Sequence, residues 1–305
     1  MKIFIMGPTG VGKTKLSIEL AKKYNAEIIN ADSVQVYKKI DIASAKVTEE
    51  EKEGIIHHCV DILNSDETYS VHDFQQTVRK KITEITQRGH VPIIVGGTGL
   101  YIKAALYDYQ FDEMENDHHA INEKYKDYTN EQLHDHLKSI DEESAKTLHF
   151  NNRRRVLRAI EIYETTGKRK SEMLEEQEHI CLYDAYFVGL TLPRDVLYER
   201  INKRVDVMME NGLKEEMERL YSQGLTRNHQ SMKAIGYKEW FDYYDHQIDL
   251  NDVLELIKKH SRQYAKRQYT WFKNQFDVHW YDVNLENFEQ TIEQVTDDIE
   301  KILKV

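Results

Sequence analysis

Short apolar runs alternate with amphipathic segments along the first 110 residues of this 305-residue chain. The strand-like runs lie at 2–6, 26–30, 59–63 and 91–95. Apolar residues recur at helical spacing over 13–24 and 71–88, and Ser70 with Asp73 forms a capping box before the second of these helices. Because strands and helices alternate, the pattern predicts a parallel sheet covered by helices.

The pattern changes after residue 111. The next segment is polar, lacks strand-like runs and predicts a helical insertion. Strand-like runs return at 182–190 and 277–283, and helical patterns lie at 194–210, 213–222, 236–245, 251–273 and 285–304. The predicted fold class is therefore α/β, with a core formed by 1–111 and 179–305 and a helical insertion domain at 112–178.

A glycine-rich stretch directly follows the first predicted strand. It fits the pattern G-x-x-x-x-G-K-[ST], the phosphate loop of P-loop NTPases. Its members are Gly7, Pro8, Thr9, Gly10, Val11, Gly12, Lys13 and Thr14. Backbone N–H groups and the following helix N-terminus favour an anion. Lys13 adds a full positive charge, and the Thr14 hydroxyl is suited to hold Mg²⁺. The stretch predicts a diphosphate-binding site in a P-loop NTPase-like sheet.

The usual metal-binding aspartate of such proteins has no counterpart in the expected place. P-loop NTPases commonly carry it at the end of an apolar strand. Here the run 91–95 ends in Gly96-Gly97-Thr98-Gly99, without a carboxylate. Asp32 is the nearest acid at a strand end, and the carboxyl ends of parallel strands lie where ligands bind. Its position leaves three roles open, which are metal ligand, helix cap and general base.

Two basic runs interrupt an acidic background. The chain has a net charge of −11, yet six Lys or Arg and no Asp or Glu occur between Lys258 and Lys273. Four arginines lie between Arg153 and Arg158. Each run is either a solvated helix face or a contact with nucleic-acid phosphates, because local patches can differ from the net charge.

The apolar stretches and the cysteines of the chain indicate where in the cell we expect the protein. No apolar stretch approaches the roughly 20 residues that span a membrane, and the N-terminal apolar run is too short for a secretory signal. Cys59 and Cys181 lie far apart without metal-ligand spacing, as is typical of free thiols in a reducing compartment. We therefore expect a cytoplasmic protein with no membrane partner that acts as a monomer.

Eight segments carry a family resemblance, in order from Gly7 to Phe272. They are GPTGVGKT, ADSVQVYKKIDIASAK, HHCVDI, IIVGGTGLYIKAAL, RRVLRAIEIYETTGK, LYERINKRVDVMMENGLKEE, KAIGYKE and YAKRQYTWF. Together they resemble the tRNA dimethylallyltransferases, also called isopentenyl-tRNA transferases or the IPP transferase family.

The resemblance implies a prenyltransferase that modifies tRNA. Such an enzyme moves a five-carbon allyl group from dimethylallyl diphosphate to the N6 amine of adenine 37, beside the anticodon. It releases diphosphate and uses Mg²⁺ as cofactor. The implied partners are the tRNA anticodon stem-loop and dimethylallyl diphosphate, whose diphosphate would lie in the phosphate loop.

Matching positions imply the site residues. Asp32 matches the general base, a role typically worth about 10²–10⁴-fold in rate. Thr98 matches the threonine that orients the amine, and Arg204 matches an arginine that reaches the diphosphate. The implied tRNA-binding residues are Asp32, Ser33, Val34, Gln35, Thr98, Arg154, Arg155, Val156, Leu157, Arg158, Lys266, Arg267 and Gln268. An amide such as Gln35 offers both donor and acceptor to a base edge.

Some positions depart from the family pattern or keep two interpretations. Many members have Gln at the position of Arg154 and Asp-Ile-Gly-Thr-Ala-Lys-Pro where this chain has 41–47. An arginine early in the insertion often touches tRNA, but 117–121 contains none. The aromatic residues around 264–271 either stack on RNA bases or pack the helix onto the core.

Three other functions share parts of this pattern. A small-molecule kinase would use the same loop to bind ATP, but it leaves the basic run near Lys266 without a role. An enzyme that prenylates free AMP or ATP would not need an RNA-gripping insertion. A non-catalytic nucleotide switch that binds RNA would leave the RNA chemically unchanged.

Overall fold

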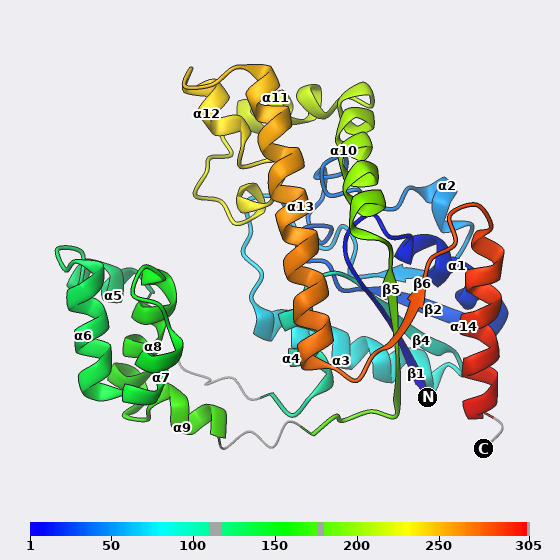
Figure 1. The fold of residues 1–305 in the computed structure, drawn as a ribbon, viewed down its shortest axis with the longest axis horizontal. Coiled ribbons are helices and arrows are strands. Elements are labelled where there is room, and N and C mark those ends of the chain that lie inside the picture. The colour runs from blue at the N-terminus through cyan, green and yellow to red at the C-terminus, as the bar shows by residue number, and fades with distance from the viewer. Residues whose placement is uncertain (110–117, 176–179, 304–305) are drawn as a thin grey trace. The chain divides into compact units, whose positions relative to one another are not determined.

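The chain forms two compact units in a computed structural model that describes residues 1–109, 118–175 and 180–303 (Figure 1). The first unit comprises Met1–Leu106 and Leu182–Val305, and the second comprises Tyr107–Cys181. The predicted insertion, 112–178, falls inside this second unit. Each unit has its own cluster of buried apolar side chains.

A six-stranded sheet organises the first unit. Its order is β3-β2-β4-β1-β5-β6, and every neighbouring pair is parallel. The strands are β1 (Lys2–Met6), β2 (Ala26–Asn30), β3 (His57–His58), β4 (Val91–Val95), β5 (Ala185–Thr191) and β6 (His279–Asp282). The predicted parallel α/β sheet is therefore confirmed.

The third strand does not lie where the sequence pattern predicted it. The run 59–63 is not a strand, and the paired residues are His57 and His58 instead. Cys59 and Asp61 adopt φ values of 62° and 55°, which break an extended chain. Only Leu63 forms an isolated bridge, with Tyr37.

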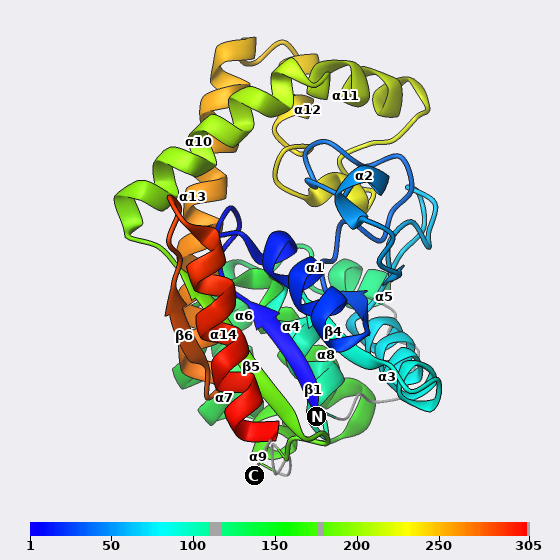
Figure 2. The same ribbon diagram turned by 90° about the vertical axis from the view of Figure 1, so that its right-hand side faces the viewer.

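Helices cover both faces of this sheet (Figures 1 and 2). On one face, α1 (Lys13–Tyr24) and α14 (Phe288–Leu303) contribute Leu16, Leu20 and Val295 to a core shared with Ile3 and Ile5. Strand side chains alternate between faces, so Phe4 points the other way. That second face is covered by α3 (Val71–Gln87) and α4 (Gly99–Leu106), which pack against each other.

The helices after β5 form an extension beside the sheet (Figure 2). They are α10 (Arg194–Glu210), α11 (Leu213–Ser222), a 3₁₀ turn (Ser231–Lys233), α12 (Trp240–Tyr244) and α13 (Leu250–Gln275). The helix predicted at 236–245 begins only at Trp240, and Gly236, with a φ of 95°, is not in a helical conformation. The short α2 (Glu49–Lys52) starts at a Thr48 capping box.

The second unit is helical. It contains α5 (His118–Lys124), α6 (Asn130–Ile140), α7 (Glu142–Thr147), α8 (Arg153–Thr166) and α9 (Lys170–Glu175). Leu133, Leu137, Val156 and Ile160 lie at the centre of its core. Throughout the described part of the chain, no helix has the length and apolar character needed to cross a membrane.

Candidate active site

The phosphate loop joins β1 to α1 and requires glycine at two close approaches. Gly7 has a φ of 142°, and a Cβ there would lie 2.5 Å from the Leu190 carbonyl oxygen. Gly12 has a φ of 106°, and a Cβ there would lie 2.8 Å from the Phe288 ring. The loop is thus confined between β5 and the start of α14. This packing keeps its N–H groups in one arrangement.

A cavity of about 780 Å³ opens beside this loop. Its lining includes charged and polar side chains from separate elements of the first unit. These are Lys13, Thr14, Asp32, Gln35, Glu51, Arg200, Lys203, Arg204, Tyr264 and Gln268. The cavity brings together three predicted groups of residues, from the phosphate loop, the Asp32 segment and the α13 segment.

Lys13 and Arg204 supply positive charge at the phosphate end. The Lys13 Nζ donates to the carbonyl oxygens of Gly7 and Pro8, at 3.0 and 2.8 Å. An ammonium group has three donors, so one remains for a ligand. Desolvation by the surrounding protein lowers the pKa of Lys13 to about 8, and the charge of nearby Arg204 acts in the same direction. An anion bound here would raise the pKa of Lys13 again, because a nearby negative charge favours the charged ammonium.

Asp32 faces these cations from the end of β2. Its Oδ1 accepts backbone N–H groups from Val34 at 2.8 Å and Gln35 at 3.4 Å. One oxygen therefore caps the turn, and Oδ2 takes no part in the hydrogen bonds found among the described residues. Desolvation raises the pKa of Asp32, although these two hydrogen bonds, Lys13 and Arg204 oppose the shift. A carboxylate with a raised pKa and one available oxygen is suited to accept a proton.

Thr98 lies against the same turn. Its hydroxyl accepts the Ser33 N–H at 3.3 Å and donates to the Ser33 Oγ at 3.4 Å. The residue follows the Gly96-Gly97 turn, where a Cβ on Gly96 would lie 2.2 Å from the Ala31 carbonyl oxygen. This close approach of the two strand ends places the Thr98 and Asp32 backbones side by side.

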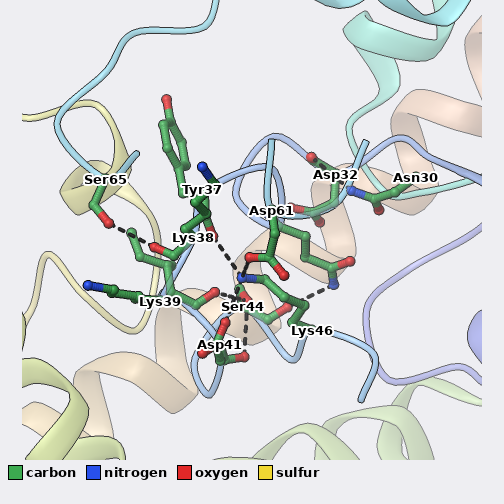
Figure 3. A network of polar contacts seen from close by, with 12 residues as sticks. Asn30, Asp32, Tyr37, Lys38, Lys39, Asp41, Ser44, Lys46, Asp61 and Ser65 are labelled. Carbon is green, nitrogen blue, oxygen red and sulfur yellow. Dashed lines mark hydrogen bonds and ion pairs between the residues drawn. The ribbon is translucent and has the colours of Figure 1, made fainter. Parts of the chain in front are cut away.

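The loop after Asp32 is held by side chains rather than by regular secondary structure (Figure 3). Gln35 donates its amide Nε2 to the carbonyl oxygens of Ser44 and Ala45, at 3.0 and 3.2 Å. These amide donors therefore brace the loop, and the Gln35 Oε1 is the atom left for a ligand. Ala43 packs against Gly236, where an added Cβ would lie only 2.5 Å away.

Lys46 is the centre of the network in Figure 3. Its side chain is only 6% exposed, and its Nζ lies 2.6 Å from both Asp41 and Asp61. The same ammonium donates to the Tyr37 carbonyl oxygen at 2.7 Å. Lys46 thereby ties the loop that follows Asp32 to the segment that contains Asp61. The sequence resemblance included Lys46 but indicated no such role.

The α13 segment divides into exposed and buried residues. Lys266 and Arg267 are exposed, whereas Gln268 is buried with its amide bound inside the protein. Of the interleaved aromatic residues, Trp271 packs against Gly99 and Tyr264 lines the cavity. Burial raises the pKa of Tyr264 to about 12, so its hydroxyl stays protonated.

The second unit presents the other predicted basic run. Arg154 and Arg155 are exposed on α8, while Arg158 pairs with Glu161 at 2.8 Å. Val156 and Leu157 are in the core of this unit. Their side chains are therefore directed away from solvent, and the arginines form the exposed part of the run. The absent early arginine concerns 117–121, of which residue 117 lies outside the described residues.

A metal site would have to be completed by ligand atoms. No group of three or more His, Cys, Asp or Glu side chains suitable for a metal occurs among the described residues. Thr14 is exposed at the phosphate end of the cavity. Mg²⁺ commonly takes one or two protein ligands plus phosphate oxygens and water. The residues present fit that arrangement.

Sequence reasoning missed two cations of the cavity that lie on α10. Arg200 and Lys203 line it together with Arg204, and the Arg200 Nε donates to the Gly10 carbonyl oxygen at 3.2 Å. Their spacing in α10 is i, i+3 and i+4, which places them on one helical face. That spacing was the available signal. His57, which belongs to the HHCVDI segment, also lines the cavity.

The sheet and the loop define an α/β protein with a P-loop-like fold. The model of the family described as IPP transferase matches residues 35–275. The chain belongs to the IPP transferase family.

Curated relatives and solved structures agree with this assignment. The chain is 52% identical to the tRNA dimethylallyltransferase of Bacillus cereus (strain AH187) over 282 residues, 92% of this chain and 89% of that one. A tRNA delta(2)-isopentenylpyrophosphate transferase from Staphylococcus epidermidis has 47% identity and a TM-score of 0.73, with 98% of both chains covered. A eukaryotic dimethylallyltransferase acting on tRNA has 33% identity and a TM-score of 0.85, covering 97% of this chain and 77% of that one.

Proposed function

We propose that this chain is a tRNA dimethylallyltransferase that moves the dimethylallyl group of dimethylallyl diphosphate to N6 of adenine 37 in tRNA. The observation that carries the proposal is the single cavity shared by the phosphate loop and Asp32. In this reaction the diphosphate leaves from one side of the allylic carbon. The amine attacks from the opposite side, so the general base that deprotonates the amine is needed there. The family assignment supports the same chemistry.

The phosphate end would stabilise the leaving group. As the allylic C–O bond breaks, negative charge grows on the diphosphate. Lys13, Arg204 and the loop N–H groups would bind that charge in a desolvated setting, where such interactions are strong. Mg²⁺ held by the Thr14 hydroxyl would add further charge neutralisation at the diphosphate.

The other end would handle the acceptor amine. As N6 forms its bond to the allylic carbon, one amine proton must leave, and Asp32 Oδ2 would take it. The Thr98 hydroxyl would orient the amine, and the Gln35 Oε1 would accept from the base. The target base must leave its stack to enter such a cavity, at about a few kcal/mol.

Exposed basic residues would bind the RNA backbone. Lys266 and Arg267 lie beside the cavity-lining residues Tyr264 and Gln268 on α13. Arg154 and Arg155 are exposed on the second unit, which would contact the anticodon stem-loop. This division suits RNA recognition, in which phosphate contacts position the molecule while a pocket reads the base.

The test is mass analysis of tRNA nucleosides after incubation with the purified protein, dimethylallyl diphosphate and Mg²⁺. We expect adenosine 37 to gain one five-carbon unit with release of diphosphate. A stem-loop carrying guanine at that position is the matched control and should gain nothing. Unmodified adenosine in the wild-type reaction would contradict the proposal.

Parallel reactions separate the rival functions. A kinase would consume labelled ATP in the presence of a small acceptor. A free-nucleotide prenyltransferase would modify AMP as readily as the stem-loop. A non-catalytic RNA binder would retain the stem-loop without changing its mass.

A further inference from the structure

Gln268 is a buried residue of α13 that directly follows two exposed residues. It is 5% exposed, whereas Lys266 and Arg267 directly before it face solvent. On α13 it shares one face with Ala265 and Phe272, both fully buried. A buried primary amide must find partners for its donors and its acceptor, or it destabilises the fold.

Both ends of this amide bind backbone groups from different loops. The Oε1 accepts the Thr9 N–H of the phosphate loop at 2.9 Å. The Nε2 donates to the Gly97 carbonyl oxygen at 3.0 Å. These partners are 259 and 171 residues away along the chain. One side chain therefore connects the loop after β1 with the turn after β4.

α13 packs tightly against the Gly96–Gly99 turn around Gln268. A Cβ on Gly97 would lie 2.1 Å from the Gln268 Nε2, and one on Gly99 would lie 2.1 Å from the Trp271 ring. The helix is thus pressed against the backbone of the Gly96–Gly99 turn. Movement of either partner relative to α13 would break a hydrogen bond or create a clash.

The two connected loops carry opposite sides of the proposed chemistry. The Thr9 hydroxyl accepts from the Arg204 Nη1 at 3.3 Å, on the phosphate side. Gly97 directly precedes Thr98, which holds the Ser33 backbone beside Asp32. The Gln268 amide lies between these two sets of contacts.

We propose that Gln268 is a positioning residue that sets the distance between the diphosphate site and the acceptor base site, and that it does not contact tRNA. The proposal rests on the function proposed above for its account of catalysis. The requirement is specific for an amide. A glutamate would retain the acceptor for Thr9 but place a second oxygen against the Gly97 carbonyl, and a methionine would satisfy neither partner.

Two binding measurements on the full chain test this role. The probes are inorganic diphosphate with Mg²⁺ and an unmodified anticodon stem-loop, each titrated separately. For Gln268→Met we expect diphosphate affinity to fall about tenfold, as loss of a buried hydrogen-bond pair predicts. Stem-loop affinity should stay within about twofold, because Gln268 is only 5% exposed and both ends of its amide are bound to backbone groups.

Matched variants give the contrast. Gln263→Met makes the same change at an exposed position of α13 and should alter neither affinity. Lys266→Ala should weaken the stem-loop alone. A Gln268→Met protein that loses stem-loop affinity while binding diphosphate normally would overturn the proposal, as would one with both affinities unchanged.

Kinetics provide a second readout that general destabilisation does not produce. Gln268→Glu should lower kcat and raise KM for the prenyl donor, while KM for tRNA stays within about twofold of wild type. An increased KM for tRNA alone would overturn the assignment. Thermal unfolding checks that each variant is folded, and the glutamate variant serves if the methionine variant unfolds. The diphosphate titration does not depend on transfer, so failure of the proposed function is recognised separately.

Discussion

The two units of this chain hold their charged residues in different environments. In the first unit, Lys13 and Asp32 face each other across a cavity, and desolvation moves the pKa of both. In the second unit, Arg154 and Arg155 stand exposed on α8 above a small apolar core. Charged side chains are therefore desolvated in the first unit and solvated on α8 in the second.

This difference suits the charges in the cavity to catalysis and the exposed charges on α8 to attracting RNA. Charges removed from water interact strongly, and their protonation responds to a ligand. Exposed charges are screened by salt within about 10 Å and contribute mainly to encounter and long-range attraction. We therefore expect substitutions in the cavity to change rates, and substitutions on α8 to change RNA affinity. The following experiments test this contrast, in descending order of the change we expect.

The largest effect is expected for Asp32→Asn. Loss of the base should lower kcat by about 10²–10⁴-fold, while stem-loop affinity remains. Since burial raises the pKa of Asp32, ionisation in the folded state reduces stability as pH rises through that pKa. The variant should therefore be at least as stable as wild type at neutral pH.

Single-turnover kinetics and urea unfolding measure the two effects. Asp66→Asn, at an exposed position of the same unit, is the control. Wild-type turnover in Asp32→Asn would remove Asp32 from the mechanism. A variant less stable than wild type at neutral pH would show that its turn-capping hydrogen bonds outweigh desolvation.

Lys13→Met should reduce kcat/KM for the prenyl donor by about 10²–10³-fold, comparable to losing one preorganised donor at a site of developing charge. Steady-state kinetics with varied dimethylallyl diphosphate measure the change. Stem-loop affinity in the absence of donor is the control and should be retained. An equal loss in both measurements would indicate that Lys13 supports the fold instead.

Buried and exposed ion pairs can be compared directly within this protein. Lys46→Met should lower the free energy of unfolding by about 1–3 kcal/mol, because it leaves the Tyr37 carbonyl and two carboxylates without their shared partner. Lys146→Met, in the second unit, removes pairs with Glu142 and Glu143 from a side chain 57% exposed. Its effect should be about 0–1 kcal/mol. Urea unfolding monitored separately in each unit tests the difference.

Arg155→Ala should weaken stem-loop binding by only a few-fold and should make that binding less dependent on salt. Removing one phosphate contact from single-stranded nucleic acid changes the logarithmic salt slope by about 0.7. Titrations at several salt concentrations measure it. The donor KM should not change, and an unchanged salt slope would mean that Arg155 touches no phosphate.

The smallest expected effect is the uptake of protons by Lys13 when diphosphate binds. Because desolvation lowers the pKa of Lys13 to about 8, part of the population is neutral near that pH. Bound diphosphate favours the charged form, so Lys13 should take up a fraction of a proton on binding at pH 8 and almost none at pH 6. Calorimetry in buffers of different ionisation enthalpy measures the net uptake. Its difference between wild type and Lys13→Met removes the protons that diphosphate itself exchanges and should follow this pH dependence.

Much of the fold could be predicted because its signals are local. The strands at 2–6, 26–30 and 91–95 were confirmed to the residue, as was the helix at 13–24. Each is an uninterrupted apolar run or a helical pattern with its own boundary residues. The run 59–63 had similar composition but was wrong, because positive φ values at Cys59 and Asp61 come from loop contacts that composition does not reveal.

The site could be predicted in part. The phosphate loop is a continuous stretch of chain between β1 and α1. Its eight residues therefore form a motif that can be recognised in the sequence. Gln35 and Gln268 were both predicted to bind tRNA. In the structure the Gln35 Nε2 and both ends of the Gln268 amide bind backbone groups, and the Gln35 Oε1 is left for a ligand. The same amide serves either purpose, and the sequence does not indicate which partner it meets.

The parallel sheet, the phosphate loop and the residues available for chemistry could all be inferred from the amino-acid sequence. Those properties depend on contacts between residues close in the chain and on the alternation of apolar side chains. Three features became visible in the folded chain, which are the shared cavity of Asp32 and Lys13, the two aspartates around Lys46 and the two loops joined by Gln268. Burial and partner choice depend on which distant segments pack together, and those conditions set each group's pKa and hydrogen bonds.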